Sequence, residues 1–106
     1  MSYDIDITVQ HPDGYASGFE VGNITYNVSR MVLEACGVTY RWFDGMECAK
    51  ALPILHFAWR NLKRNPPHFR RFEPDNGWGT YEQFMPYMTR FYAMARLHPT
   101  GIIRVS

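Results

Sequence analysis

Two hydrophobic patterns divide the chain into an extended N-terminal part and a helical remainder. In residues 3–9 polar and apolar side chains alternate, with Ile5, Ile7 and Val9 on one side, which is typical of a half-buried strand. A turn at residues 11–14 leads into a second predicted strand at residues 17–24. Because two strands alone are marginally stable, this hairpin must pack on helices or pair with a second subunit.

The segment Gly-Asn-Ile-Thr-Tyr-Asn (22–27) marks the change from strand to helix. Strand periodicity places Asn23, Thr25 and Asn27 on one side of it. After it, apolar residues recur at helical spacing up to Gly37, so we predict a first helix with Asn27 or Thr25 as its N-cap. The polar row has two interpretations, because it could cap backbone donors or present Asn23 and Asn27 to a ligand.

A second helix is predicted after a short strand or extended connection at residues 38–43. Asp44 and Glu47 resemble a capping box, and Pro53 should separate a loose start from a firmer helix. The predicted core stripe of this helix is Leu52, Leu55, Trp59 and Leu62. Its other side is basic, with His56, Arg60, Lys63 and Arg64.

Residues 65–79 are rich in proline and glycine, which predicts a long loop and a candidate binding surface. Thr80 and Gln83 then form a capping box, and the last helix should run to about Leu97 with a kink at Pro86. The apolar arc of this helix is wider than one face. It is therefore wrapped by the fold or shared with another chain, and we expect a homodimer.

These elements predict one domain over residues 1–106, because a chain of 106 residues can bury one core. The expected fold class is α+β, in which an N-terminal β-hairpin of two, possibly three, strands packs on about three α-helices. The two cysteines, Cys36 and Cys48, match no metal-ligand or disulfide-scaffold spacing, and we expect reduced thiols in a cytoplasmic protein. No apolar run reaches the length of a membrane span, so we expect no membrane partner.

Three short sequence motifs are informative in combination. They are Asn-Ile-Thr-Tyr-Asn (23–27), Ala-Leu-Pro-Ile-Leu (51–55) and Arg-Leu-His-Pro-Thr-Gly-Ile (96–102). In this combination, from about residue 20 to residue 102, the chain resembles a family of small uncharacterised bacteriophage and prophage proteins with an N-[IV]-T-Y-N motif near the first helix. The family's final helix ends in an R-P-D-G-like tail, whereas this chain has residues 98–100 (His-Pro-Thr) before Gly101. The resemblance implies a viral origin and names no activity.

Charge is distributed unevenly along the chain, although the net charge is only +1. Residues 1–49 have two basic and seven acidic side chains, a net charge of −5, whereas residues 50–106 have nine and three, a net charge of +6. This polarity favours a basic face for an anionic partner, or head-to-tail self-association. Nine of the eleven basic residues are arginine, the side chain best suited to phosphate and carboxylate, although a GC-rich genome gives the same bias.

Basic and aromatic side chains mix most densely around residues 60–78. Phosphate binding needs concentrated positive charge and nucleotide binding adds rings for stacking, although a run of charge is more often a solvated helix end. The candidate binding residues are Arg60, Lys63, Arg64, His68, Phe69, Arg70, Arg71 and Trp78, together with Asn23 and Asn27.

We expect no catalytic residue, metal site or cofactor. The four histidines lie far apart in the sequence, and no signature supports Cys36 or Cys48 with His56 as nucleophile and base. The first functional hypothesis is therefore a non-enzymatic phage protein that antagonises a bacterial antiviral defence system, as anti-CRISPR proteins do, by docking onto a host protein or protein–nucleic-acid complex. The second is a protein that sequesters a small anionic nucleotide between arginine and aromatic side chains. Direct binding of DNA or RNA is a third, less favoured by so small a net charge.

Overall fold

The computed structural model describes residues 2–106, and Met1 lies outside the described residues. Strands β1 (Ser2–Gln10) and β2 (Ala16–Thr25) form the N-terminal hairpin, and β3 (Ile102–Val105) returns at the end of the chain. Between them lie the α-helices α1 (Ser29–Cys36), α2 (Cys48–Arg64), α3 (Pro66–Arg70) and α4 (Tyr81–Leu97), and two 3₁₀ turns, η1 (Tyr26–Val28) and η2 (Tyr40–Phe43). The predicted α+β class and the N-terminal hairpin are confirmed.

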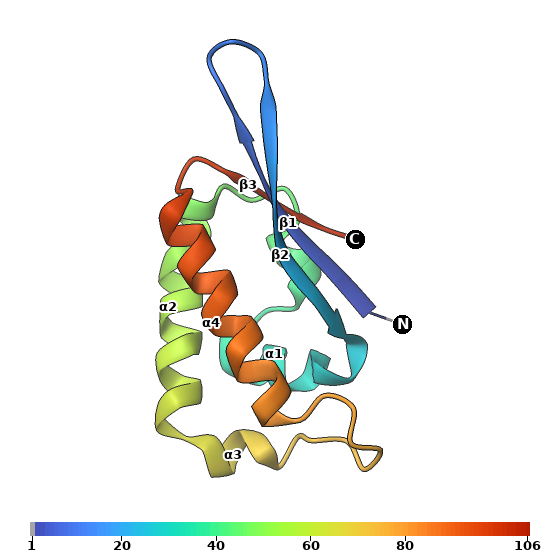
Figure 1. Cartoon of the computed structure of the whole chain (residues 1–106). Coiled ribbons are helices and arrows are strands. Elements are labelled where there is room, and N and C mark those ends of the chain that lie inside the picture. Colours follow the sequence, from blue (N-terminus) through green and yellow to red (C-terminus); the bar gives the residue numbers. More distant parts are fainter. Residues whose placement is uncertain (1) are drawn as a thin grey trace.

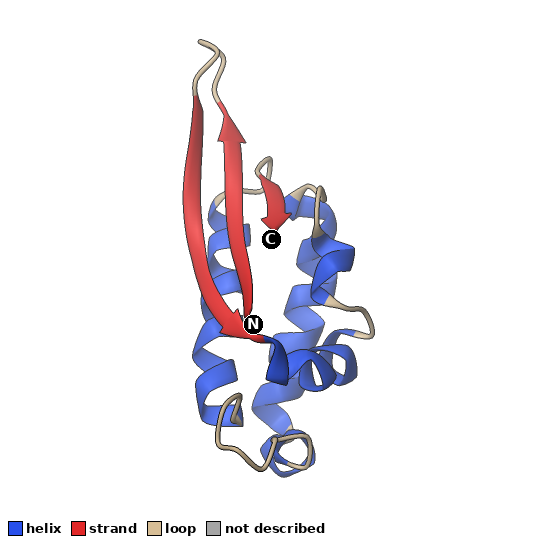
Figure 2. Ribbon diagram, turned by 90° about the vertical axis from the view of Figure 1, so that its right-hand side faces the viewer, coloured by secondary structure: helices blue, strands red, loops and turns tan. Residues whose placement is uncertain are grey.

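The sheet is antiparallel and has the order β2-β1-β3, so the first strand is central. Ile5 and Ile7 of β1 face the helices and are paired with Val105 and Ile103 of β3. A bulge between Ile5 and Asp6 adds Val21 to the buried side of β2. The turn of the hairpin extends beyond the helices (Figures 1 and 2), and the molecule measures 48 × 27 × 19 Å.

The opposite side of the sheet is polar. Asp6 lies between Glu20 of β2 and Arg104 of β3, and Asn23 donates from its amide nitrogen to an Asp4 oxygen at 2.8 Å. Acidic side chains from the first half of the sequence therefore gather on the outer face of the sheet. The basic residues of α2, by contrast, lie in the helical layer, and Figure 2 shows the separation of this layer from the sheet.

Helix α4 is wide in its apolar arc because it packs against both α2 and β2 (Figure 1). Its buried residues come from all the sides that face these neighbours: Tyr81, Phe84, Tyr87, Met88, Phe91 and Ala95. The predicted capping box is present, since Thr80 accepts from the Gln83 amide at 3.2 Å and the Gln83 side chain accepts from Thr80. Wrapping by the fold thus accounts for most of the apolar surface of this helix.

Helix α2 begins at Cys48, five residues before the proline at which we predicted the firm helix. Its first backbone donors are satisfied by the end of the chain, because the amides of Cys48 and Ala49 donate to the carbonyls of Gly101 and Pro99. The predicted capping role of Asp44 is wrong, since Asp44 instead accepts from the Val105 amide at 2.9 Å. These contacts join the start of α2 to β3.

The segment before α2 also differs from the prediction. Residues 38–43 contain no strand, and the chain forms the turn η2, in which Tyr40 and Phe43 are buried. The 3₁₀ turn has three residues per turn, so it brings two residues three apart onto one side. The third strand of the sheet is β3, which lies in a segment for which we predicted no helix or strand.

Candidate functional site

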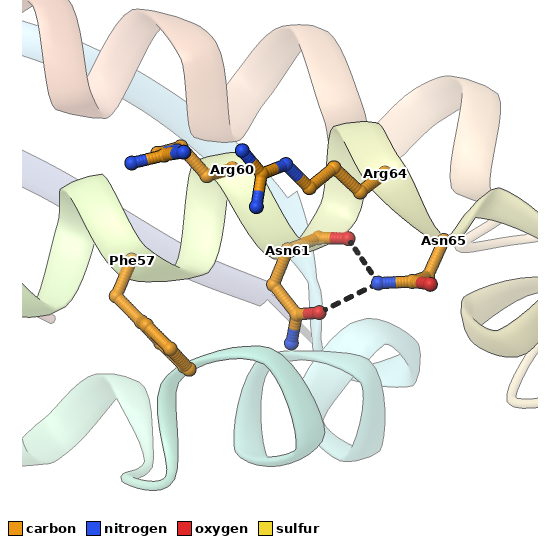
Figure 3. A pocket seen from close by; sticks show the side chains of 5 residues that line it. All are labelled: Phe57, Arg60, Asn61, Arg64 and Asn65. Atoms are coloured by element: carbon orange, nitrogen blue, oxygen red, sulfur yellow. Dashed lines mark hydrogen bonds between the residues drawn. The ribbon is translucent and has the colours of Figure 1, made fainter.

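The outward side of α2 exposes two arginines beside an exposed ring. Arg60 and Arg64 line a depression of about 330 Å³ together with Phe57, Asn61 and Asn65 (Figure 3). The Asn65 amide nitrogen donates to the backbone oxygen of Asn61 at 3.3 Å and to its side-chain oxygen at 2.9 Å, which fixes the floor of the depression at the helix end. In Figure 3 both guanidinium groups lie on one side of the helix, and Phe57 and Asn61 lie on the other. The depression is open, as a docking surface would be.

The positive charges of this helix are not neutralised by the chain itself. Within residues 2–106, none of Arg60, Lys63 and Arg64 forms an ion pair with an acidic side chain. Lys63 instead places its ammonium group over the Trp59 ring, 4.6 Å from the ring centre. Three cations within five residues therefore remain available to an anionic partner.

Trp59 was predicted to lie in the core, and that prediction is wrong. Its ring is half-buried at the seam between α2 and α4, where the indole N–H donates to the Thr89 hydroxyl at 3.1 Å. The Thr89 hydroxyl donates in turn to the Met85 carbonyl at 2.9 Å. An indole has an apolar body and one polar N–H, which suits a position between core and solvent.

Rings and cations alternate along this seam. The His56 ring stacks on Tyr92, with centres 5.4 Å apart and planes within 5°, and the Trp59 ring lies 5.5 Å from Tyr92. Arg96 extends over the other part of Tyr92, with its guanidinium carbon 5.4 Å from the ring centre. We name as the basic face Phe57, Trp59, Arg60, Lys63 and Arg64 of α2 with His56, Tyr92 and Arg96.

Tyr92 and Arg96 are functional candidates that the sequence analysis missed. The spacing contains a signal that could have found them. His56, Trp59 and Lys63 are three or four residues apart on α2, as Tyr92 and Arg96 are on α4, so each set lies along one edge of its helix. Two such edges meet only because α2 and α4 are neighbours, which the pattern of one helix does not show.

The basic residues of α3 differ from those of α2 because they contact acidic groups of the chain. Nε2 of His68 lies 3.2 Å from a Glu34 oxygen. Arg70 donates from two nitrogens to one Glu82 oxygen, at 3.1 and 2.8 Å, and stacks on Tyr81. The hydrogen bond from Arg70 lowers the pKa of the Glu82 carboxyl. Contacts within the chain therefore use part of the capacity of His68 and Arg70 to bind an anionic partner.

Arg71 lies in a different part of the surface from the other basic residues of this segment. It lines a hollow of about 370 Å³ with Arg30, Phe72 and Glu73, in which the Arg30 guanidinium carbon lies 5.3 Å from the Phe72 ring centre. Phe69, which was named as a binding residue, is fully buried between the helices. Its ring is part of the core and is not available to a partner, and the predicted loop at residues 65–79 contains α3 because Phe69 anchors that turn.

The remaining candidates lie at the start of α4. Trp78 and Asn23 line one hollow of about 420 Å³ with Ser2, Ile24, Thr25 and Gln83. Asn27 lies beside it, under Gly79, where a Cβ atom on the glycine would be 3.1 Å from the Asn27 Cβ. Thr25 is the N-cap of η1, where its hydroxyl accepts from the Asn27 amide at 3.3 Å. The first α-helix, α1, has Val28 as its N-cap without a side-chain hydrogen bond, so the predicted capping role of Asn27 is wrong. The structure thus divides the predicted set among the basic face, α3 with the Arg71 hollow, and the Trp78 hollow.

The two cysteines are free thiols in apolar surroundings. Burial raises the pKa of the Cys36 thiol to about 12 and that of Cys48 to about 11, whereas a reactive cysteine has a lowered pKa. Within residues 2–106, no three histidine, cysteine or acidic side chains are grouped so that they could hold a metal ion. None of the described helices is long and apolar enough to span a bilayer.

Comparison with known proteins adds no further assignment. Searches of protein-family models, of curated proteins and of solved structures give no match to this chain.

Proposed function

We propose that this chain is a non-enzymatic phage protein that antagonises a bacterial antiviral defence system by docking its basic face onto an acidic surface of a host protein or protein–nucleic-acid complex. The bacterial cytoplasm would be its site of action. The observation that supports docking is the open row of Arg60, Lys63 and Arg64, which has no acidic partner within residues 2–106. The viral origin comes from the family resemblance, and the defence target is inferred from that origin together with the small size of the chain and its surface rich in arginine and aromatic residues.

Charge and rings on this face have complementary roles. Exposed cations accelerate encounter with an acidic surface and fix the orientation of the partners. Aromatic and arginine side chains supply most of the binding energy at protein interfaces when they are desolvated. Phe57 is 66% exposed and lines the same depression as Arg60 and Arg64, so it offers apolar area to a partner beside these cations.

The decisive variant reverses the charge of two face residues, Arg60→Glu with Arg64→Glu. A matched control, Arg41→Glu with Arg104→Glu, changes the net charge by the same amount at exposed positions outside the basic face. Equal melting temperatures of the two variants and the unchanged chain would show that all three are folded. Any difference in function then comes from the position of the charge.

The assay is the plating efficiency of phage on a panel of bacterial strains that each contain one defence system. We expect expression of the chain to restore plaques on at least one strain, the face variant to lose this effect and the control to keep it. The complex recovered from that strain should also weaken as salt rises, because exposed charge pairs are screened. Restoration on no strain, or full activity of the face variant, would reject the proposal.

The second function, sequestration of a small anionic nucleotide, is favoured by one observation. Arg30 and Arg71 line the same hollow as Phe72, which offers guanidinium groups and a ring together. A native mass spectrum of protein purified gently from bacterial lysate distinguishes the two functions. An added mass of a few hundred daltons, lost in Arg30→Glu with Arg71→Glu, would support sequestration, whereas a bare chain or a bound host protein would support docking.

A further inference from the structure

Trp78 is a large apolar side chain that the fold leaves in solvent. It is 67% exposed, although it lies in a segment that is tightly fixed on both sides. Its backbone N–H donates to the Asn76 side chain at 3.0 Å, and the next residue, Gly79, donates to the Gln83 side chain at 2.7 Å. The backbone that bears the indole is therefore fixed by hydrogen bonds, so the exposure of the ring follows from the fold.

Gly79 shows why this segment can lie so close to η1. Its φ is +98°, and a Cβ atom there would be 3.1 Å from side-chain atoms of both Asn27 and Val28. Only glycine combines that backbone conformation with that approach. The loop is thereby closed against η1, and Trp78 is brought to the end of β2, beside Asn23 and Thr25.

The hollow beside the indole has polar groups with unused hydrogen-bonding capacity. Asn23 uses its amide nitrogen for Ser2 and Asp4, and within residues 2–106 its side-chain oxygen has no partner. Gln83 uses its oxygen for the backbone of Gly79 and Thr80, and its amide nitrogen has no partner in the same part of the chain. One free acceptor and one free amide donor therefore border the ring, with the hydroxyls of Ser2 and Thr25.

The described residues of the hollow favour a neutral ligand over an anionic one. Its lining residues, Ser2, Asn23, Ile24, Thr25, Trp78 and Gln83, include no cation. The ionisable side chain that contacts them is acidic, since Asp4 accepts from Asn23 at 2.8 Å. A phosphate here would meet a carboxylate and no guanidinium group. The hollow thus differs in chemistry from the basic face and from the Arg71 hollow.

We infer that this hollow, of about 420 Å³, binds a neutral saccharide, with one sugar ring against the Trp78 indole and its hydroxyl groups on Asn23 and Gln83. The apolar C–H face of a pyranose matches an exposed indole, and its hydroxyls both donate and accept, as the free amide groups require. The site is open, which suits one or two residues of a chain or glycan. This inference does not rest on the proposed docking function.

The test uses the indole N–H signals in a ¹H–¹⁵N spectrum of the full chain, which has three tryptophans. The probes are the neutral trisaccharides maltotriose, cellotriose and N,N′,N″-triacetylchitotriose, with adenosine monophosphate as the anionic ring-containing comparison. We expect at least one trisaccharide to shift the Trp78 signal saturably and to leave the Trp42 and Trp59 signals in place. Trp78→Ala assigns the signal and should weaken binding about tenfold, as expected for loss of one stacking contact.

Two further variants make the test specific. Asn23→Ala should weaken the same titration, because it removes the free acceptor. Trp42→Ala, which removes another exposed indole, should leave it unchanged. Arg60→Glu with Arg64→Glu should also leave it unchanged, so failure of the docking function and failure of this site are distinguishable.

Three results would overturn the inference. They are no shift with any of the three trisaccharides, equal shifts of the Trp42 or Trp59 signals, and saturable binding of adenosine monophosphate that Trp78→Ala removes. The last result would make the hollow a nucleotide site in spite of its charge.

Discussion

Tyr87 occupies space that Gly22 provides. The φ of Gly22 is +146°, and a Cβ atom at this position would be 3.3 Å from the Tyr87 ring. The ring of Tyr87 lies edge-on to Tyr40, and the hydroxyl groups of both are buried without a partner within residues 2–106. The hairpin is thus fitted to a tyrosine pair at the centre of the molecule.

We predict that Gly22→Ala lowers the free energy of unfolding by about 1–3 kcal/mol, through backbone strain and the displaced ring. Gly18→Ala is the matched control, because Gly18 lies on the same strand with nothing within 4 Å of its Cβ position. Urea titrations of the two variants measure the difference. Equal stability of the two variants would show that the ring moves aside without cost.

At the scale of the residue, the sequence predicts the local backbone conformation better than it predicts which side chains are in contact. The capping box at Thr80 follows from local chemistry alone, and it is confirmed. Trp59 and Phe69 were placed wrongly, because each position depends on a neighbouring element. Trp59 lies at the seam with α4, and Phe69 is buried by the helices around it. The spacing of apolar residues along one helix does not indicate which edge of that helix a neighbouring element will cover.

Strand β3 has a larger role than its four residues suggest. Ile103 is fully buried and is paired with Ile7 of the central strand. The other edge of β3 is also occupied, since the Gly45 amide donates to the Ile103 carbonyl and the Ile103 amide donates to Met46. The strand therefore links the hairpin to the start of α2.

We predict that Ile103→Ala lowers the free energy of unfolding by about 2–5 kcal/mol, because it leaves a cavity between the sheet and the helices. Arg104→Ala, at the next position, should change it by less than about 0.5 kcal/mol, since Arg104 is exposed. Thermal unfolding of both variants measures the contrast. A small effect of Ile103→Ala would mean that the sheet does not need its third strand.

At the scale of the element, two strands and the last helix could be predicted because their periodicity extends over seven or more residues. The run Ile-Ile-Arg-Val (102–105) is too short for such a signal, and it becomes a strand because β1 offers an edge. The start of α2 was also missed. Its first amides bind the carbonyls of Gly101 and Pro99, which are fifty residues away in sequence.

At the scale of the whole molecule, the thiols of Cys36 and Cys48 are half-buried and buried, and both stay protonated at neutral pH. Their pKa values are raised to about 12 for Cys36 and about 11 for Cys48, above about 8.5 in an unfolded chain. Above about pH 8.5 the unfolded chain loses these protons first. The unfolded state then binds fewer protons than the folded state, so stability falls as pH rises.

We predict that the free energy of unfolding is lost progressively between about pH 8.5 and pH 11, by up to about 1.4 kcal/mol per pH unit for each thiol. Urea titrations at pH 7, 8, 9 and 10 in the presence of a reducing agent measure this slope. The double variant Cys36→Ala, Cys48→Ala should have a flatter slope between pH 8.5 and 10. An unchanged slope would assign the effect to other groups.

At the scale of the molecule, the charge polarity of the sequence predicted a basic face but not its composition. Arg60, Lys63 and Arg64 are close in sequence and stay together, whereas His68 and Arg70 turn toward Glu34 and Glu82. The acidic partners were present in the sequence, but their nearness is a result of tertiary packing. The predicted homodimer stays a prediction, which sedimentation equilibrium of the full chain can decide.

The pairing of β1 with β3 also determines when the fold can form during translation. The central strand leaves the ribosome first and can pair with β2 at once, but its other edge has no partner until residue 105 has emerged. Contacts of such long sequence separation form slowly. We therefore expect the β1 edge beside Ile5 and Ile7 to stay unpaired until β3 has been synthesised, and an unpaired strand edge of this kind is a site at which chaperones bind nascent chains.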